Sequence, residues 1–313
     1  MTRLFIALLL LPTSLVAQQE GSFALLVRVD SIVMAELART NTPGAAVAVE
    51  HHGQLLLAKG FGFENVEANS PTSAETVFRI GSITKQFTST VVMQLVEQGK
   101  IGLDDDMTKY LPDYPTQGNR VTIRHLLTHT SGIKSYTGMG PKFWNESSRL
   151  DLTNDQMLAL FKDVPFEFKP GEKYAYNNSA FFLLGVIIEK VTGKPYRQSV
   201  TEQIFEPLGL ASTSYCDDRA ILRHRAAGYE SQAGKLLNAV PLSLNTPGAA
   251  GSLCSTVLDL VRWQNAFDEA RPISAASRDQ IRTSAKLNDG SPTNYGFGVG
   301  VRPFQEHRAF AHS

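Results

Sequence analysis

The sequence predicts an α/β (α+β) protein in which segments from both ends of the chain form an antiparallel sheet, with flanking helices and a large helical insertion. Strand-like patterns occur near both ends, at Ala45 to Gly60 and at Tyr295 to Arg302, with a last fragment at Arg308 to His312. Between them, roughly residues 101–267 are rich in helices and loops. We expect an active-site cleft between the sheet and the helical part.

The N-terminal part of this pattern is a helix followed by a hairpin. Apolar residues recur at helical spacing from Phe23 to Ala38, and Pro43-Gly44 breaks the pattern. Two strands, Ala45 to His51 and Gln54 to Gly60, are then joined by the turn dipeptide His52-Gly53.

Two helices are predicted in the middle of the chain. One follows Ser82 and stops at Gly99, and the other runs from Ala180 to Val191 and stops at Gly193. The apolar spacing that defines the first consists of Ile83, Phe87, Val91 and Leu95. Ser82 is therefore expected at or near a helix N-terminus, where backbone N–H groups favour developing negative charge.

The overall composition describes an ordinary globular protein. The chain has 313 residues, of which 42% are hydrophobic and 19% charged. Its 30 basic and 30 acidic residues cancel, and no basic run occurs, so binding to nucleic acid or to an anionic membrane is disfavoured. No internal repeat or low-complexity tract is evident.

The first 17 residues are predicted to be a secretory signal peptide. Arg3 precedes the apolar run Leu4 to Leu11, and the segment Ser14 to Ala17 ends in a small residue. A membrane anchor is the alternative, but the apolar run is shorter than the ~20 residues that a span needs. We expect cleavage near Ala17, export to the periplasm or beyond, and a mature hydrolase domain over residues 18–313.

Cys216 and Cys254 would then meet an oxidising compartment. Their spacing fits neither a metal site nor a redox motif. Two interpretations stay open at this point: one disulfide, or two small buried residues.

The strongest chemical signal is Ser82 followed three residues later by Lys85. Side chains three apart share a helix face, so the hydroxyl and the ammonium would lie side by side. A serine needs such a partner to become a nucleophile, and Ser-x-x-Lys is a known acyl-transfer motif. A second copy, Ser131-Gly132-Ile133-Lys134, reads as a turn and is not expected to be a site.

A second candidate element is Tyr176-Asn177-Asn178, just before the later helix. In extended chain Tyr176 and Asn178 would face the same cleft. A nearby lysine cation would lower the pKa of Tyr176 and make it a general base for Ser82. Asn178 would hold a substrate amide or the lysine. The alternative is structural, with Tyr176 as an edge aromatic and Asn178 as a helix N-cap.

Several segments in order resemble the β-lactamase-related serine hydrolases, which include class C β-lactamases, serine D,D-peptidases and esterases with a β-lactamase/transpeptidase-like fold. The resemblance runs from about Pro43 to the last residue. The segments that carry it are Phe78 to Thr88, Gly99 to Asp105, Val121 to Gly132, Pro170 to Asn178, and Gly251 to Thr256 with Asp259-Leu260.

The resemblance implies roles for four residues. Ser82 would be the nucleophile, Lys85 its electrostatic partner, Tyr176 the base or proton shuttle, and Asn178 a substrate-side contact. It implies a small-molecule or peptide substrate and no cofactor, and it leaves the substrate and the oligomeric state open. A non-catalytic, penicillin-binding-like receptor or assembly module of the same fold is the alternative function.

The chain ends in Phe310-Ala311-His312-Ser313, which resembles the start of the family's His-x-Gly strand motif. His312 would contact substrate where β-lactamases have a lysine, which lowers the expected efficiency of β-lactam hydrolysis. The resemblance implies that the family's second oxyanion donor, later strands and closing helix lie beyond Ser313, so we expect a C-terminally incomplete domain.

A metal site is not expected. His125 and His129 have the spacing of a zinc-binding helix, but the glutamate of His-Glu-x-x-His and an acidic third ligand are missing. These histidines are predicted to be packing and turn residues.

Overall fold

The computed structural model describes residues 13–141 and 143–313. The chain divides into two compact units, one up to Thr76 with Ala226–Ala239, the other Val77–Arg225 with Val240–Ser313. Most of the predicted signal peptide, residues 1–12, lies outside the described residues, so that prediction stays untested. Among the described helices, none has the length and apolar character that crossing a membrane requires.

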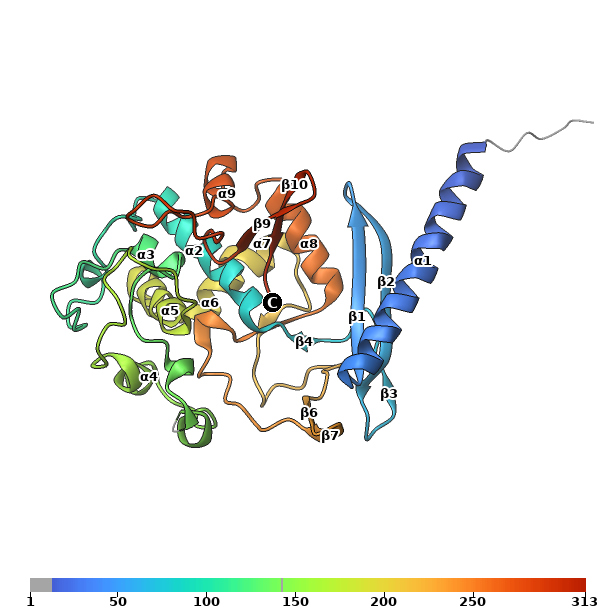
Figure 1. The fold of residues 1–313 in the computed structure, drawn as a ribbon, viewed down its shortest axis with the longest axis horizontal. Coiled ribbons are helices and arrows are strands. Elements are labelled where there is room, and N and C mark those ends of the chain that lie inside the picture. The colour runs from blue at the N-terminus through green and yellow to red at the C-terminus, as the bar shows by residue number, and fades with distance from the viewer. Residues whose placement is uncertain (1–12, 142) are drawn as a thin grey trace, which may run out of the picture. The chain divides into compact units, whose positions relative to one another are not determined.

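The smaller unit is a helix with two antiparallel sheets, shown in blue and orange in Figure 1. The elements are α1 (Thr13–Thr40), β1 (Gly44–His51), β2 (Gln54–Asn65), β3 (Ser70–Pro71), β6 (Tyr229–Gln232) and β7 (Lys235–Asn238). The predicted N-terminal helix and hairpin are confirmed. His52 and Gly53 take positive φ angles of 49° and 78°, the combination that a tight two-residue hairpin turn requires. An ion pair of 2.7 Å between Lys59 and Asp30 joins β2 to α1.

The larger unit is mainly helical. Its helices are α2 (Thr84–Glu97), α3 (Ile123–Leu127), α4 (Asn154–Phe161), α5 (Asn178–Thr192), α6 (Tyr196–Val200), α7 (Glu206–Leu208), α8 (Val257–Asp268) and α9 (Ala275–Ile281). Its strands are β4 (Phe78–Arg79), β5 (Ser214–Tyr215), β8 (Leu253–Ser255), β9 (Gly300–Phe304) and β10 (His307–Ala311).

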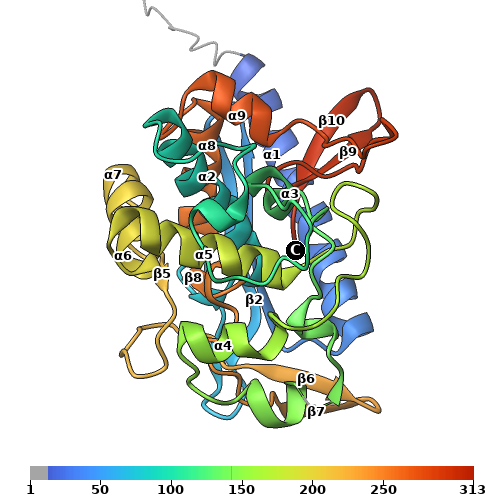
Figure 2. The same ribbon diagram turned by 90° about the vertical axis from the view of Figure 1, so that its left-hand side faces the viewer.

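Helix α5 is the centre of the hydrophobic core of this unit. Its residues from Ser179 to Ile188 are all buried, which explains why it is apolar on every side rather than on one stripe. Figure 2 shows α5 running between α6 and α3, and it also packs against α2. Both predicted central helices are confirmed, and Gly193 ends α5 in the left-handed conformation that favours glycine.

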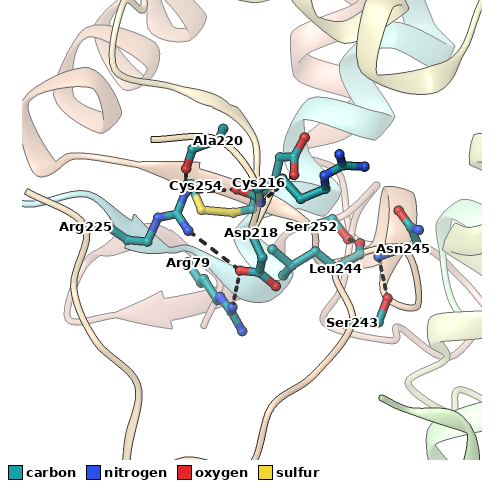
Figure 3. A network of polar contacts seen from close by, with 12 residues as sticks. Arg79, Cys216, Asp218, Ala220, Arg225, Ser243, Leu244, Asn245, Ser252 and Cys254 are labelled. Atoms are coloured by element: carbon teal, nitrogen blue, oxygen red, sulfur yellow. Dashed lines mark hydrogen bonds and ion pairs between the residues drawn. A yellow bond between two sulfur atoms is a disulfide. The ribbon is translucent and has the colours of Figure 1, made fainter. Parts of the chain in front are cut away.

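A small sheet of order β4-β8-β5 leads into the Ser82 region. A disulfide joins Cys216, just after β5, to Cys254 in β8, with Cα atoms 5.3 Å apart. Figure 3 shows this disulfide beside a charged cluster in which Arg79 contacts Asp218 at 2.9 Å. Of the two interpretations of the cysteines, the structure has the disulfide.

The β-lactamase-like mixed α/β fold class is confirmed, but two details of the predicted sheet are wrong. Strands from the two ends form separate sheets, β1-β2-β3 and β9-β10. Each of these strands pairs with the strand next to it in sequence rather than with a strand from the other end of the chain. The C-terminal strand begins at Gly300 rather than Tyr295. Gly298, with φ 72°, turns the chain against the backbone of Lys85, where a Cβ would lie 2.6 Å from the Lys85 carbonyl oxygen.

Candidate active site

Ser82 is held in a short 3₁₀ turn, Gly81–Ile83, directly before α2. Strand β8 fixes the chain on both sides of it. The N–H of Ile80 donates to the carbonyl of Leu253 at 2.9 Å, and the N–H of Leu253 donates to Thr84 Oγ1 at 3.1 Å. The nucleophile candidate therefore lies on a rigid turn at a helix N-terminus, as predicted.

Lys85 lies in the first turn of α2 and has no exposed surface. Its Nζ atom lies 3.0 Å from Ser82 Oγ, 2.8 Å from Asn178 Oδ1 and 2.7 Å from the carbonyl oxygen of Ala250. All three positions around the amine nitrogen are thus occupied. Burial lowers the pKa of Lys85 well below 10.5, because the charged form loses its hydration.

Asn178 connects the lysine to a neighbouring loop. Its Oδ1 accepts from Lys85, while its Nδ2 donates to Thr137 Oγ1 at 3.1 Å. The N-cap of α5 is Asn177, whose side chain accepts the N–H of Ala180. The capping role considered for Asn178 therefore belongs to the residue before it, which leaves Asn178 free to hold Lys85.

Tyr176 lies against both members of the Ser82–Lys85 pair. Lys85 Nζ is 4.8 Å from the centre of its ring. Desolvation by burial raises the pKa of Tyr176 to about 12, and a hydrogen bond with Ser82 opposes this rise only in part. The predicted lowering of the Tyr176 pKa is therefore wrong. The reason is that desolvation of the Tyr176 hydroxyl, which disfavours the phenolate, is the largest effect on its pKa.

His129 packs against Tyr176 and is completely buried. Its ring centre is 4.4 Å from that of Tyr176 and 4.7 Å from that of Tyr295. Its Nδ1 accepts the N–H of Asn177 at 3.0 Å, so the neutral ring carries its proton on Nε2. That Nε2 has no hydrogen-bond partner among the described residues. Burial, and next the Lys85 charge, lower the pKa of His129 well below 6.5.

His312 also lies near Tyr176, with ring centres 5.9 Å apart. Its Nε2 is 2.9 Å from the hydroxyl oxygen of Tyr295. Burial lowers the pKa of His312, and the Lys85 charge lowers it further. The structure therefore places His312 beside Tyr176, whereas Ser82, Lys85, Tyr176 and Asn178 form the contacting cluster.

The alternative motifs have structural roles. Ser131 is buried, and Lys134 forms an ion pair of 2.6 Å with Glu167, as expected for a Ser-x-x-Lys match outside a site. His125 Nδ1 accepts the N–H of Thr122 in the capping box of α3, and His129 takes a left-handed φ of 58° in a turn. Within residues 13–141 and 143–313, no group of three or more potential metal ligands is found.

Two hollows lie at this cluster. The first, which we name the Trp144 hollow, has a volume of ≈ 190 Å³ and includes Ser82 and Asn178. The second, which we name the Tyr174 hollow, has a volume of ≈ 530 Å³ and includes Tyr176 and His312. Ser82 and Tyr176, the two candidate reactive side chains, thus line different hollows, although both lie next to Lys85.

The family model described as Beta-lactamase matches residues 29–313, which is nearly the whole chain and includes every residue of this cluster. The chain belongs to the beta-lactamase family. The resemblance predicted from the motifs is thereby confirmed.

Among curated proteins, this beta-lactamase family chain is similar to Protein flp of Staphylococcus aureus (strain MRSA252), with 32% identity over 242 residues. That match covers 75% of this chain and 47% of flp, so the chain spans about half the length of this curated relative. Among solved structures, the octameric penicillin-binding protein homologue from Pyrococcus abyssi has 33% identity and a TM-score of 0.77, covering 89% of this chain and 65% of that one. A D-stereospecific amidohydrolase from Streptomyces sp. has 29% identity and a TM-score of 0.73, and the match covers 88% of this chain and 84% of that one.

Sequence reasoning missed three contacts of this beta-lactamase family site. The Ala250 carbonyl and the hydroxyl of Thr137 hold Lys85 and Asn178 in place, and Tyr295 contacts His312. Ala250 directly precedes the matched segment that begins at Gly251, and this position was the one sequence feature that could have indicated its role. Thr137 and Tyr295 carry no motif, since their roles depend on tertiary packing alone.

Proposed function

We propose that the chain is an exported serine hydrolase that acts through an acyl-enzyme on an ester or an amide. The observation that carries this proposal is the position of a buried Lys85 amine 3.0 Å from Ser82 Oγ, with the centre of the Tyr176 ring 4.8 Å from the same amine. A hydroxyl paired with a desolvated amine is the arrangement of an activated nucleophile.

The burial of Lys85 favours the neutral amine as the base, and its three contacts can accommodate that form. The Ala250 carbonyl and Asn178 Oδ1 can only accept hydrogen bonds, so they take the two hydrogens of a neutral amine. The nitrogen lone pair then faces the remaining neighbour, the Ser82 hydroxyl. A lysine with a lowered pKa is neutral in a larger fraction of molecules and can accept the Ser82 proton.

The reaction follows from these positions. Ser82 Oγ attacks the substrate carbonyl carbon as its proton moves to Lys85. Backbone N–H groups at the start of α2, including that of Ser82, favour the negative charge on the substrate oxygen. Tyr176, protonated near neutral pH because its pKa is about 12, relays a proton to the leaving alcohol or amine as its bond to carbon breaks. Water then attacks the acyl-enzyme ester and gives one proton to Lys85, which passes it to Ser82 Oγ as the bond between that oxygen and the acyl carbon breaks and the acid leaves.

Relatives support this class of reaction without naming the substrate. One similar structure is called a D-stereospecific amidohydrolase and another a penicillin-binding protein homologue. Esters, D-amino-acid amides and peptides are therefore the first substrates to test. Efficient β-lactam hydrolysis is less favoured, because burial lowers the pKa of His312 and leaves little positive charge to hold a substrate carboxylate.

The disulfide supports export. Disulfides persist in oxidising compartments, and the Cys216–Cys254 bond is formed in this structure. The bond agrees with the predicted signal peptide at residues 1–17. The intact mass of the secreted protein would show whether the chain is cleaved near Ala17.

The test is the intact mass after exposure to a fluorophosphonate probe, with wild type and Ser82→Ala side by side. We expect one adduct in wild type, mapped to Ser82 by peptide sequencing, and none in the variant. Turnover of p-nitrophenyl acetate should disappear in the same variant. Wild-type protein that is folded by circular dichroism but neither labels nor turns over ester would support the non-catalytic alternative and end the hydrolase proposal.

A further inference from the structure

Two hollows adjoin the Ser82 cluster, one at each of the two side chains that the proposed reaction uses. In acyl transfer the acyl group stays on the serine while the leaving group departs with a proton. The Trp144 hollow contains Ser82, so it receives the part of the substrate that remains attached. The Tyr174 hollow contains Tyr176, the proton donor, so it receives the part that leaves.

The lining of the Trp144 hollow is uncharged, and three of the described residues in it are aromatic. Tyr136, Phe143 and Trp144 form its aromatic wall, and Leu242 contributes an aliphatic side chain. Of the described residues that line it, none carries a charge. Tyr136 and Phe143 are almost fully buried, whereas Trp144 is 46% exposed, so the wall has a rigid base and an accessible rim.

Its volume limits the group that fits. An apolar cavity of about 150 Å³ holds benzene. The Trp144 hollow, at ≈ 190 Å³, is slightly larger, so it accommodates a chain or ring of about six carbons. Carbons beyond that number would extend past the half-exposed Trp144 into solvent.

The Tyr174 hollow differs in chemistry. It is lined by Tyr174, Tyr176 and Tyr295 together with the polar groups of Arg302 and His312. A hollow with an arginine and a histidine accepts polar leaving groups, while the uncharged hollow on the Ser82 side disfavours a charged acyl group because a carboxylate there would lose hydration without a partner.

We propose that the Trp144 hollow is the acyl site and that it selects uncharged, apolar acyl groups of up to about six carbons. This inference rests on the proposed function and names the substrate class of the same site. Trp144 and Leu242 are the residues that set the preference.

The test uses p-nitrophenyl esters with a constant leaving group and acyl chains of two, four, six and eight carbons. Each buried methylene should raise kcat/KM about fourfold, from its transfer free energy, and the increase should stop at about six carbons. Butanoate should be preferred at least about tenfold over hemisuccinate, which has the same chain length and a negative charge. Equal kcat/KM for two, four and six carbons, or for butanoate and hemisuccinate, would overturn the inference.

Variants distinguish an effect of the Trp144 hollow on acyl preference from a general loss of activity. Trp144→Ala should reduce the gain per methylene to less than about twofold, and Leu242→Ala should act in the same direction. Trp144→Phe keeps an aromatic wall but loses the Nε1 hydrogen bond to the Thr137 carbonyl, so it should retain the chain-length preference. Tyr174→Ala, in the other hollow, should leave the acyl preference unchanged. The same loss of preference in Tyr174→Ala as in Trp144→Ala would overturn the assignment.

Fluorophosphonate labelling of the same samples distinguishes the two proposals. Ser82 labelling without acyl preference overturns only the assignment of the Trp144 hollow. Absence of both labelling and turnover overturns the proposed function, and this inference with it.

Discussion

The Nζ atom of Lys85 lies 2.7 Å from the carbonyl oxygen of Ala250, a residue 165 positions later in the chain. A backbone carbonyl can only accept a hydrogen bond, so this contact orients one hydrogen of the amine away from Ser82. Asn178 orients a second hydrogen. The position that remains at the nitrogen faces the serine hydroxyl, 3.0 Å away.

Removal of the amine should nearly abolish the reaction. Lys85→Ala is expected to lower kcat/KM about a hundred- to ten-thousand-fold, the usual contribution of a general base. Lys134→Ala is the matched control, since Lys134 ends the second Ser-x-x-Lys match and pairs with the partly exposed Glu167. The control should keep wild-type activity, and a loss of less than about tenfold in Lys85→Ala would contradict the role of the amine.

The rate of Ser82 labelling should rise with pH. Below the pKa of Lys85 the neutral fraction of the amine increases tenfold per pH unit, and the rate levels off once the amine is neutral. Burial places the pKa of Lys85 well below 10.5, so the labelling rate should level off at a pH well below 10.5. Because the pKa of Tyr176 is about 12, its ionisation should cause no decrease below about pH 11.

The measurement is the fluorophosphonate labelling rate between pH 5 and pH 10, with hydrolysis of the probe in the same buffers without protein as the control for its own pH dependence. A rate that falls as pH rises through this range would show that the charged lysine is the active form.

Tyr176→Phe tests the proton relay. The variant keeps the ring against Lys85 and His129 but removes the hydroxyl that the proposed mechanism uses to relay the proton. For an ester with a poor leaving group, such as an alkyl ester, kcat should fall about a hundred- to ten-thousand-fold. For a p-nitrophenyl ester, whose leaving group needs no proton, the loss should be much smaller. Equal losses for both esters would contradict the relay.

His129 should make stability depend on pH. Its pKa in the folded protein is well below 6.5, whereas the unfolded chain binds a proton near ~6.5. Between these values the unfolded state holds more protons, so stability is lost as pH falls, by about 1.4 kcal/mol per pH unit for this group. His129→Asn keeps an acceptor for the Asn177 N–H and tolerates the left-handed φ of 58°, but it does not titrate.

The free energy of unfolding from urea titrations at pH 5.0, 6.0 and 7.0 checks this prediction. The variant should lose stability less steeply than wild type as pH falls. His52→Asn is the matched control, because His52 also has a left-handed φ, of 49°, but is exposed. Parallel curves for wild type and His129→Asn would show that His129 is protonated in the folded state.

The disulfide should stabilise the fold outside the site. Cys216 and Cys254 are 38 residues apart, and a loop of that size is expected to contribute about 2–4 kcal/mol to the free energy of unfolding. The double variant Cys216→Ala, Cys254→Ala should be less stable by that amount while Ser82 still labels. Reductant should destabilise wild type and leave the double variant unchanged. Insensitivity of wild type to reductant would contradict the disulfide.

The sequence alone determined the local features of this protein. Ser82 and Lys85 are three residues apart at a helix start, so their proximity follows from helix geometry. His52-Gly53 formed the predicted hairpin turn, and Gly193 ended α5, because both depend on backbone preferences of a few residues. The order of the matched segments was enough to predict the family, which residues 29–313 confirm.

The predicted strand from Tyr295 failed for a reason that local patterns do not contain. Gly298 passes so close to the Lys85 carbonyl that the chain must turn there, and the strand begins only at Gly300. The contacting residue lies in another part of the sequence, so no spacing near Tyr295 announces the turn.

The tertiary structure also decided the protonation of the site. A charged lysine beside Tyr176 would lower the tyrosine pKa, but burial raises the pKa of Tyr176 and lowers that of Lys85 instead. The Ala250 carbonyl that orients the Lys85 amine and the rings that enclose His129 come from distant segments. Hydration and hydrogen-bond direction depend on everything that surrounds a group, and for these side chains the surroundings exist only once the chain has folded.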